Sequence, residues 1–196
     1  RNEPWLPGVL AHVNPAVVSA LTYAVIHERD QPDGRLSVVL SGWPLLSDEL
    51  TLIDRKTGLI QPLPRPVSLK NQSIDVIRQF APDAYINRAS HDTVKGTVAH
   101  MRPPRDSVLR QHETARPGWV IFPQWEAGAP ATLTPRSQAQ TFMFLAQNAF
   151  NYSHLGVDGF RVGTALIDQT ACYDFRYSQL DEAIAAFDRL AERRGS

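Results

Sequence analysis

Two adjacent acids, Asp48 and Glu49, stand inside an otherwise apolar stretch of the chain. Leu45 and Leu46 precede them and apolar residues recur as far as Ile53, so the stretch predicts a buried strand that carries two carboxylates. A buried carboxylate costs free energy of desolvation unless it meets a cation or hydrogen-bond donors. Two interpretations follow: the acids bind Mg²⁺ and activate a hydroxyl, or they satisfy donors of neighbouring loops. Because successive strand residues point to opposite faces, both acids can face one ion only where the strand ends or bulges.

A second group of polar residues lies between residues 89 and 104, and Gly96 within it permits close approach to the backbone. The side chains there that can carry positive charge are His91, Lys95, His100 and Arg102. Such a group suits an anionic substrate, with Lys95 offsetting the charge of a γ-phosphate and Arg102 binding an oxyanion through two hydrogen bonds. A zinc site is disfavoured, because the histidine spacing matches no common zinc pattern and no thiolate is near. The alternatives are a solvated basic loop and, for Arg102, a rigid turn with the prolines that follow it. Weaker candidates for contacting the acceptor or the nucleotide are Arg65, Lys70 and Asn71.

Length and composition are those of an ordinary globular domain. The 196 residues suffice for a full core, and 43% are hydrophobic and 20% charged. Twenty basic and twenty acidic residues cancel, which gives no electrostatic argument for binding nucleic acid or an anionic membrane. The single cysteine, Cys172, excludes an internal disulfide and a cysteine-based zinc site and is expected to be buried. Without an apolar run of about 18 residues or a signal-peptide pattern, the sequence predicts a cytoplasmic protein.

Local patterns predict a mixture of strands and helices without a strict βαβ alternation. This indicates an α/β fold, a single domain with a mixed β-sheet flanked by helices. The expected strands are 118–123 and Ala171–Tyr177, with a turn at 54–58 that leads into a short return strand. The expected helices begin at Ser73 as an N-cap, at Thr134 with Pro135, at Asp158, and after a capping box at 178–181, the last one running to Glu192.

Five strings of residues occur in an order that is unusual in combination. They are Ser47-Asp-Glu49, Leu63-Pro-Arg-Pro-Val-Ser-Leu-Lys-Asn71, residues 91–100 with Arg102-Pro-Pro104, residues 148–153 and residues 172–177. Together they resemble the HPr kinase/phosphorylase family, in particular its branch called HprK-related kinase A. The resemblance extends from about Leu36 to the C-terminus and depends on the whole set, because no single string would carry it.

The resemblance implies an HPr-kinase-like core of the P-loop/PEP-carboxykinase-like type over residues 36–196, preceded by an N-terminal segment, residues 1–35. It implies an ATP-dependent kinase for a serine or another hydroxyl on a small protein or peptide, also able to run the reverse reaction with phosphate as acceptor. In that scheme Asp48 is the general base and Glu49 is the acid nearer to Mg²⁺. The resemblance further implies a homo-oligomer.

One part of the family pattern is absent from this sequence, the Gly-x-x-x-x-Gly-Lys-Ser/Thr phosphate loop. Residues 33–35 run directly into Leu36–Leu40, which looks like the end of the helix that should follow such a loop. Two neighbouring parallel strands need a crossover of at least about ten residues. If the strand before Asp33 and the strand after Pro44 are such neighbours, too little chain joins them. Either the intact polypeptide has the loop between Arg35 and Leu36, or the protein is a pseudokinase or a peptide-binding module without a P-loop. We favour the first explanation.

The intact polypeptide is therefore expected to be heavier than the 21.9 kDa of this sequence. A missing loop and helix start of about ten residues or more would add about one kilodalton or more. Intact-mass spectrometry of the purified natural protein measures the difference directly. A mass of 21.9 kDa would instead identify a chain that truly has no phosphate loop.

Overall fold

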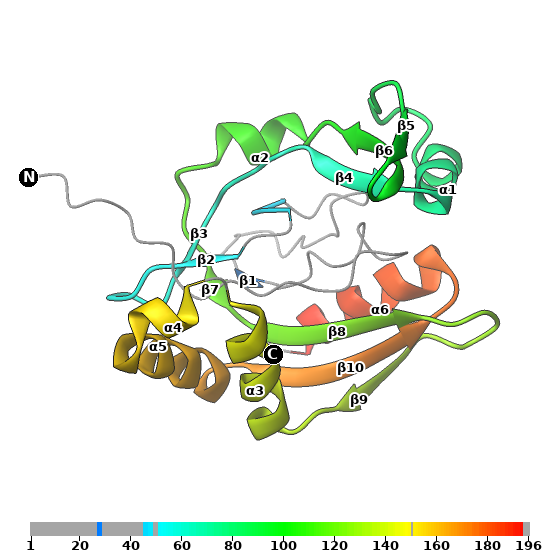
Figure 1. Ribbon diagram of the computed structural model, residues 1–196. Helices are drawn as coiled ribbons and strands as arrows, with labels where there is room; N and C mark the ends of the chain where they lie inside the picture. Colours follow the sequence, from blue (N-terminus) through cyan, green and yellow to red (C-terminus); the bar gives the residue numbers. More distant parts are fainter. Residues whose placement is uncertain (1–26, 29–44, 49–50, 150, 194–196) are drawn as a thin grey trace, which may run out of the picture.

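Two layers of sheet and helix make up the part of the chain that the computed structural model describes, residues 27–28, 45–48, 51–149 and 151–193 (Figure 1). The strands are β1 (His27–Glu28), β2 (Leu52–Ile53), β3 (Ile60–Gln61), β4 (Val67–Lys70), β5 (Ser90–Thr93), β6 (Gly96–Met101), β7 (Arg116–Pro117), β8 (Trp119–Trp125), β9 (Thr132–Pro135) and β10 (Ala171–Tyr177). The helices are α1 (Gln72–Phe80), α2 (Arg105–Leu109), α3 (Gln138–Asn148), α4 (Tyr152–Leu155), α5 (Val157–Asp168) and α6 (Leu180–Glu192). The fold is mixed α/β, as the sequence predicts. Glu49, the expected loop position between Arg35 and Leu36, and all of the predicted segment 1–35 except residues 27–28 lie outside the described residues.

The lower layer in Figure 1 is a mixed sheet in the order β8-β10-β9. β10 pairs in parallel with β8 along its whole length, from Ala171 opposite Trp119 to Tyr177 opposite Trp125. On its other side β10 pairs antiparallel with β9, with Asp174 opposite Thr134. The predicted strand Ala171–Tyr177 is therefore confirmed with its exact bounds, and it is the centre of the sheet.

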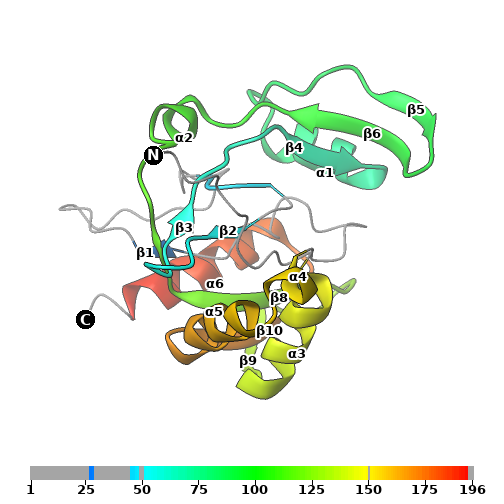
Figure 2. The ribbon, with the colours of Figure 1, turned by 60° about the vertical axis from the view of Figure 1, so that its left-hand side comes forward.

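Both faces of the mixed sheet are covered by helices, but by different ones (Figures 1 and 2). One face packs against α6, where Phe187 is fully buried and its ring centroid lies 4.8 Å from that of Phe175. Tyr177 stacks on Phe175 in the same core, and burial raises the pKa of Tyr177 to about 12. Each large apolar side chain removed from water in this way stabilises the fold by about 1.5–3 kcal/mol.

The opposite face packs against α3 and α5. Leu145 of α3 and Leu166 of α5 are buried with Val120 and Cys172 of the sheet, which confirms the expected burial of the cysteine. The two helices approach closely at Gly163, where an added Cβ would lie 2.8 Å from the ring of Phe142.

The upper layer is an antiparallel sheet in the order β4-β6-β5, covered on one face by α1. Ile74 and Ile77 of α1 are buried in one cluster with Leu69 and Ala99 of the sheet. Leu180, the first residue of α6, packs against this cluster and also against the cluster of Phe175 and Phe187 below. α6 therefore joins the two layers.

A short hairpin of β2 and β3 confirms the turn predicted at 54–58. The Gly58 N–H donates to the Asp54 carbonyl, and Gly58 adopts a φ of 70°, which favours glycine. The Asp54 carboxylate accepts hydrogen bonds from the backbone N–H and the hydroxyl of Thr57 and from the Lys56 N–H. These bonds, with the Thr57 N–H contributing most, hold the pKa of Asp54 below its usual value.

The predicted mixed sheet flanked by helices is the lower layer, but the described strands also form further, separate sheets. Besides the two three-stranded sheets, the described ranges contain the two-stranded pairs β1-β7 and β2-β3. Of the buried strand expected over 45–53, the structure describes residues 45–48 and 51–53. Leu45, Leu46 and Asp48 are buried as expected, but strand pairing in these two ranges is limited to an isolated bridge at Ser47 and to β2. Tertiary contacts, rather than a strand ladder, bury residues 45–48.

The residues expected to begin three helices do not cap them, because each bonds to another part of the chain. Thr134 and Pro135 end β9, and α3 begins only at Gln138. Ser73 lies inside α1, and its hydroxyl bonds back to Lys70 instead of capping the helix. Ser178 donates to the Ala129 carbonyl, so it forms no capping box with α6. The ends of α5 and α6 agree with the sequence to within a residue.

The helices of the described ranges are all too short or too polar to cross a membrane.

Substitution of Gly163 tests the packing of α3 on α5. Gly163→Ala is expected to lower the free energy of unfolding by about 1–3 kcal/mol, because the new methyl group overpacks against Phe142. Within a helix, alanine is usually more stabilising than glycine by about 0.5–1 kcal/mol. Here the steric cost of the added methyl group is expected to exceed that gain. Urea denaturation measures the change in the free energy of unfolding, and adding Phe142→Leu to the variant should recover part of the loss. A Gly163→Ala variant more stable than the parent would contradict the close approach.

Candidate functional site

The stretch 45–48, which leads to the first predicted acid, is anchored from two directions. The Leu45 N–H donates to the buried hydroxyl of Ser107 in α2 at 2.9 Å. The Leu46 carbonyl accepts from the Leu63 N–H at 2.6 Å, next to the parallel bridge between Ser47 and Leu63. The backbone that carries Asp48 is therefore held by segments that are distant in the sequence.

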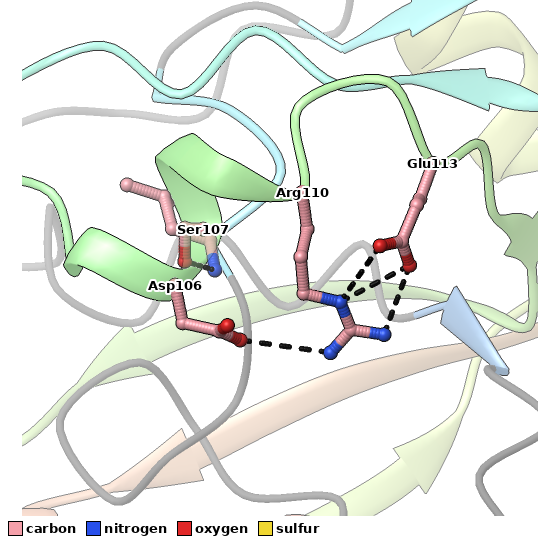
Figure 3. A network of polar contacts seen from close by, with 5 residues as sticks. Asp106, Ser107, Arg110 and Glu113 are labelled. Atoms are coloured by element: carbon pink, nitrogen blue, oxygen red, sulfur yellow. Dashed lines mark hydrogen bonds and ion pairs between the residues drawn. The ribbon is translucent and has the colours of Figure 1, made fainter.

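The helix that supplies Ser107 is itself held by an ion-pair network, which Figure 3 shows. The Arg110 guanidinium lies 2.9 Å from the Glu113 carboxylate and 3.6 Å from that of Asp106. Hydrogen bonding to Glu113 raises the pKa of Arg110, so the guanidinium stays charged. The network lies on the surface and contributes modestly to stability, but it spans α2 and the turn after it.

Asp48 is 4% exposed, and its Oδ2 accepts a hydrogen bond from the backbone N–H of Ser68 at 2.8 Å. Ser68 belongs to β4, whose other edge pairs with β6. Two residues along, the Lys70 N–H donates to the Ser73 hydroxyl at 2.8 Å. Two side chains thus supply the acceptors that a further strand would otherwise give to this edge. This explains why β4 ends its sheet instead of joining a larger one.

Lys70 is also buried, at 5% exposure, although it points to the face of β4 opposite the core residue Leu69. Residues two apart in a strand lie on one face about 7 Å apart, so Ser68 and Lys70 are neighbours. The Asp48 Oδ2 atom lies 2.8 Å from the Ser68 N atom. Adding the distance along β4 puts the carboxylate at most about 11 Å from the Lys70 Cα. Asp48 is therefore buried at the edge of β4 and Lys70 is buried within the same strand, in surroundings where electrostatic effects are stronger than in water.

The basic segment is a hairpin rather than the loop that was one of the alternatives, since β5 and β6 pair antiparallel across it. His100 is exposed and lies directly opposite Ser68, on the side of β4 away from the edge that bonds Asp48. Arg102 is exposed and its guanidinium carbon lies 4.4 Å from the centre of the Tyr85 ring. Arg65 is exposed and precedes β4 by two residues.

The remaining basic candidates lie at the far end of the hairpin. Lys95 occupies the turn between β5 and β6, five residues from His100, which corresponds to about 16 Å along a strand. His91 contacts the Thr97 hydroxyl through Nδ1 at 3.2 Å and lines a separate hollow of about 350 Å³ with Asn71 and Arg78. Asp48, Lys70 and His100 therefore all adjoin residues 68–70 of β4, whereas Lys95 lies in the turn of the hairpin and His91 in β5, on the other side of β6.

Two positioning residues, Ser68 and Ser107, were not found from the sequence, whereas Asn71 was one of its weaker candidates. Ser107 contacts Leu45 across 62 positions, and Ser68 acts through its backbone, so neither leaves a local signal. Asn71 adopts a φ of 49°, and its side-chain oxygen would lie 2.5 Å from a Cβ at position 96. The close approach permitted by Gly96 is thus made by the Asn71 side chain, which accepts the Thr97 N–H at 3.1 Å.

Groups of three or more His, Cys, Asp or Glu side chains that could hold a metal do not occur within the described residues. Magnesium requires fewer protein ligands, since one or two carboxylates and substrate phosphates are enough. Asp48 fits that requirement as one carboxylate. No protein-family model, curated protein or solved structure matches the chain.

The Asp48–Ser68 hydrogen bond leads to a stability prediction. Asp48→Ala is expected to lower the free energy of unfolding by about 1–3 kcal/mol, because the Ser68 N–H loses its acceptor. Asp48→Asn keeps a carbonyl oxygen that can accept this hydrogen bond. It should therefore lower the free energy of unfolding clearly less than Asp48→Ala. Urea denaturation of both variants gives the difference, with the exposed Asp106→Asn as a control that stays within about 0.5 kcal/mol of the parent. Equal losses for alanine and asparagine would show that the bond contributes nothing.

Proposed function

We propose that this protein is an HPr-kinase-like phosphotransferase that moves the γ-phosphoryl group of ATP to a hydroxyl of a small protein or peptide. The observation that carries the proposal is the burial of two charged residues, Asp48 at the edge of β4 and Lys70 within that strand. Charged side chains are seldom fully buried, and a buried carboxylate is a candidate for a functional role. The family resemblance of the sequence supplies the reaction type.

In the proposed reaction the acceptor hydroxyl gives its proton to Asp48 while its oxygen attacks the γ-phosphorus, and ADP leaves. The Ser68 N–H fixes the direction of the carboxylate, so that the base is oriented before the substrate arrives. Phosphoryl transfer depends mainly on positioning and on stabilising negative charge. Lys70 in β4 and His100 opposite Ser68 could supply positive charge there.

Mg²⁺ belongs to this proposal as the cation that would accompany the nucleotide. Asp48, together with Glu49, would hold it, because Mg²⁺ takes carboxylate oxygens and leaves its other positions to phosphate oxygens and water. When bound, the ion supplies neutralisation of charge on the phosphates. Binding is measurable without catalysis, as a magnesium-dependent rise in the melting temperature.

A catalytically inactive peptide- or protein-binding module is the second candidate. The position of Lys95 favours it, since a lysine about 16 Å along the hairpin from His100 is badly placed to share one phosphoryl group with Asp48. Under this alternative, the only role of Asp48 is to accept the hydrogen bond from the Ser68 N–H at the edge of β4. Nucleotide binding separates the two candidates, because a module without a phosphate loop has no site for ATP.

The catalytic role of Asp48 is tested with Asp48→Asn in the intact polypeptide. We expect transfer of ³²P from labelled ATP to a serine-containing peptide library to fall by about 10²–10⁴-fold, as is usual when a general base is lost. Affinity for a non-hydrolysable ATP analogue, measured calorimetrically, should change little. Asp106→Asn is the matched control and should retain full transfer. Undiminished transfer by Asp48→Asn, or an intact protein without affinity for the analogue, would overturn the proposal.

A further inference from the structure

One face of the mixed sheet carries a hollow beyond the helices that cover the rest of it. α3 and α5 bury the end of this face that carries Val120 and Cys172, and Figure 1 shows β8, β10 and β9 continuing beyond α3. There the strand register places side chains of all three strands on the same face. They form two rows, Phe122, Asp174 and Thr134, then Gln124, Arg176 and Thr132. These residues line one hollow of about 540 Å³, the β10 hollow, which has the size of a small-molecule site.

Two opposite charges enter the β10 hollow from the central strand of the sheet. Asp174 and Arg176 are two residues apart in β10, so they lie on one face at a spacing of about 7 Å. Their side chains are 53% and 59% exposed, although β10 has a neighbouring strand on each side. A carboxylate and a guanidinium are thus both accessible to a ligand in the middle of the sheet face.

Each of these two groups has one protein partner and keeps further polar atoms available. Asp174 Oδ1 accepts a hydrogen bond from Arg136 Nη1 at 2.6 Å, and Arg176 Nε lies 3.2 Å from the Glu126 carboxylate. Within the part of the chain that the structure describes, Asp174 and Arg176 make no other side-chain hydrogen bond or ion pair. Asp174 Oδ2 and the two terminal nitrogens of Arg176 can therefore bind a ligand while both ion pairs persist.

The two protein partners come from opposite ends of β10. The Arg136 N–H donates to the Cys172 carbonyl, and the Glu126 N–H donates to the Tyr177 carbonyl. A ligand between the two charged side chains would make one charge-assisted hydrogen bond of about 2.8 Å at each end. Across a spacing of about 7 Å, this suits a molecule whose own two charged groups are separated by one or two residues' worth of covalent bonds.

The alternation of charge selects a ligand that carries both signs. A simple anion attracted by Arg176 would also approach the carboxylates of Asp174 and Glu126. A simple cation at Asp174 would approach the guanidinium groups of Arg136 and Arg176. A molecule with an ammonium and a carboxylate instead finds a group of opposite sign at each end. The Phe122 ring, in the same row as Asp174, offers an apolar contact to the rest of such a ligand.

We propose that the β10 hollow binds a small zwitterion, a free α-amino acid or a dipeptide, with its ammonium on Asp174 and its carboxylate on Arg176. This site does not depend on phosphoryl transfer, because its residues are distinct from Asp48, Lys70 and His100.

The probes are the standard L-amino acids and their glycyl dipeptides, tested one at a time on the intact protein without nucleotide. We expect at least one probe to raise the melting temperature and to give a dissociation constant by calorimetric titration. Comparison of the two sets identifies whether the ligand is an amino acid or a dipeptide. N-acetylation or C-terminal amidation of the bound probe removes one of its charges and should raise the dissociation constant at least about tenfold.

Variants test the same two contacts from the side of the protein. Asp174→Asn and Arg176→Gln should each raise the dissociation constant of the bound probe at least about tenfold. Asp158→Asn and Arg161→Gln are the matched controls. They affect an ion pair on the surface of α5, where the Asp158 side chain is 55% exposed outside the hollow. Both controls should bind the probe as tightly as the parent.

Three outcomes would overturn the proposal. They are a lack of binding by every probe, equal affinity for the capped and the uncapped probe, and parental affinity of both hollow variants. Circular dichroism melting of each variant identifies a loss of binding that is caused by unfolding. Because the capped probes test both contacts on the parent protein, they decide the question even where a variant does not fold.

Discussion

The outer edge of β4 is the constraint on which the upper layer depends, because its main-chain N–H groups find acceptors on side chains and not on a strand among the described residues. Asp48 supplies one acceptor and Ser73 supplies the next, from opposite directions in the sequence. A carboxylate is a costly group to bury, and its cost is offset only if the hydrogen bond and nearby positive charge are retained. The position of Asp48 therefore depends on every contact that holds residues 45–47, including the bond from Leu45 to Ser107.

The same carboxylate has a structural role and, in the proposed function, a chemical one. A base that already accepts a backbone hydrogen bond is oriented in advance, which costs nothing further when the substrate binds. It is also less free to move than a carboxylate in solution. The two roles are compatible because a carboxylate offers about four acceptor directions, of which the Ser68 N–H occupies one.

Features encoded within a few residues could be predicted from the sequence, and features that depend on distant contacts could not. The alternation of Ala171–Tyr177 and the apolar spacing of α6 are local, and both elements lie where they were expected. Thr134 and Pro135 carry an equally local helix-start pattern, but pairing of Thr134 with Asp174 in the sheet overrides it.

The candidate site shows the same difference between features that are encoded locally and features that depend on distant contacts. Burial of Asp48 follows from its apolar neighbours, whereas its partner Ser68 is a backbone group in a strand twenty residues away. The proximity of His100 to that strand arises from antiparallel pairing, and the separation of Lys95 arises from the same pairing. A list of basic residues in one segment cannot distinguish the two ends of a hairpin, because only the register does so.

Leu180 gives the two layers a common structural element. β10 carries Phe175 on the face that packs against α6. The first residue of that helix, Leu180, also packs against the cluster that contains Leu69 of β4. The mixed sheet and the strand that orients Asp48 therefore share one apolar side chain. Because that side chain contributes to both clusters, a cavity at Leu180 would loosen both layers at once.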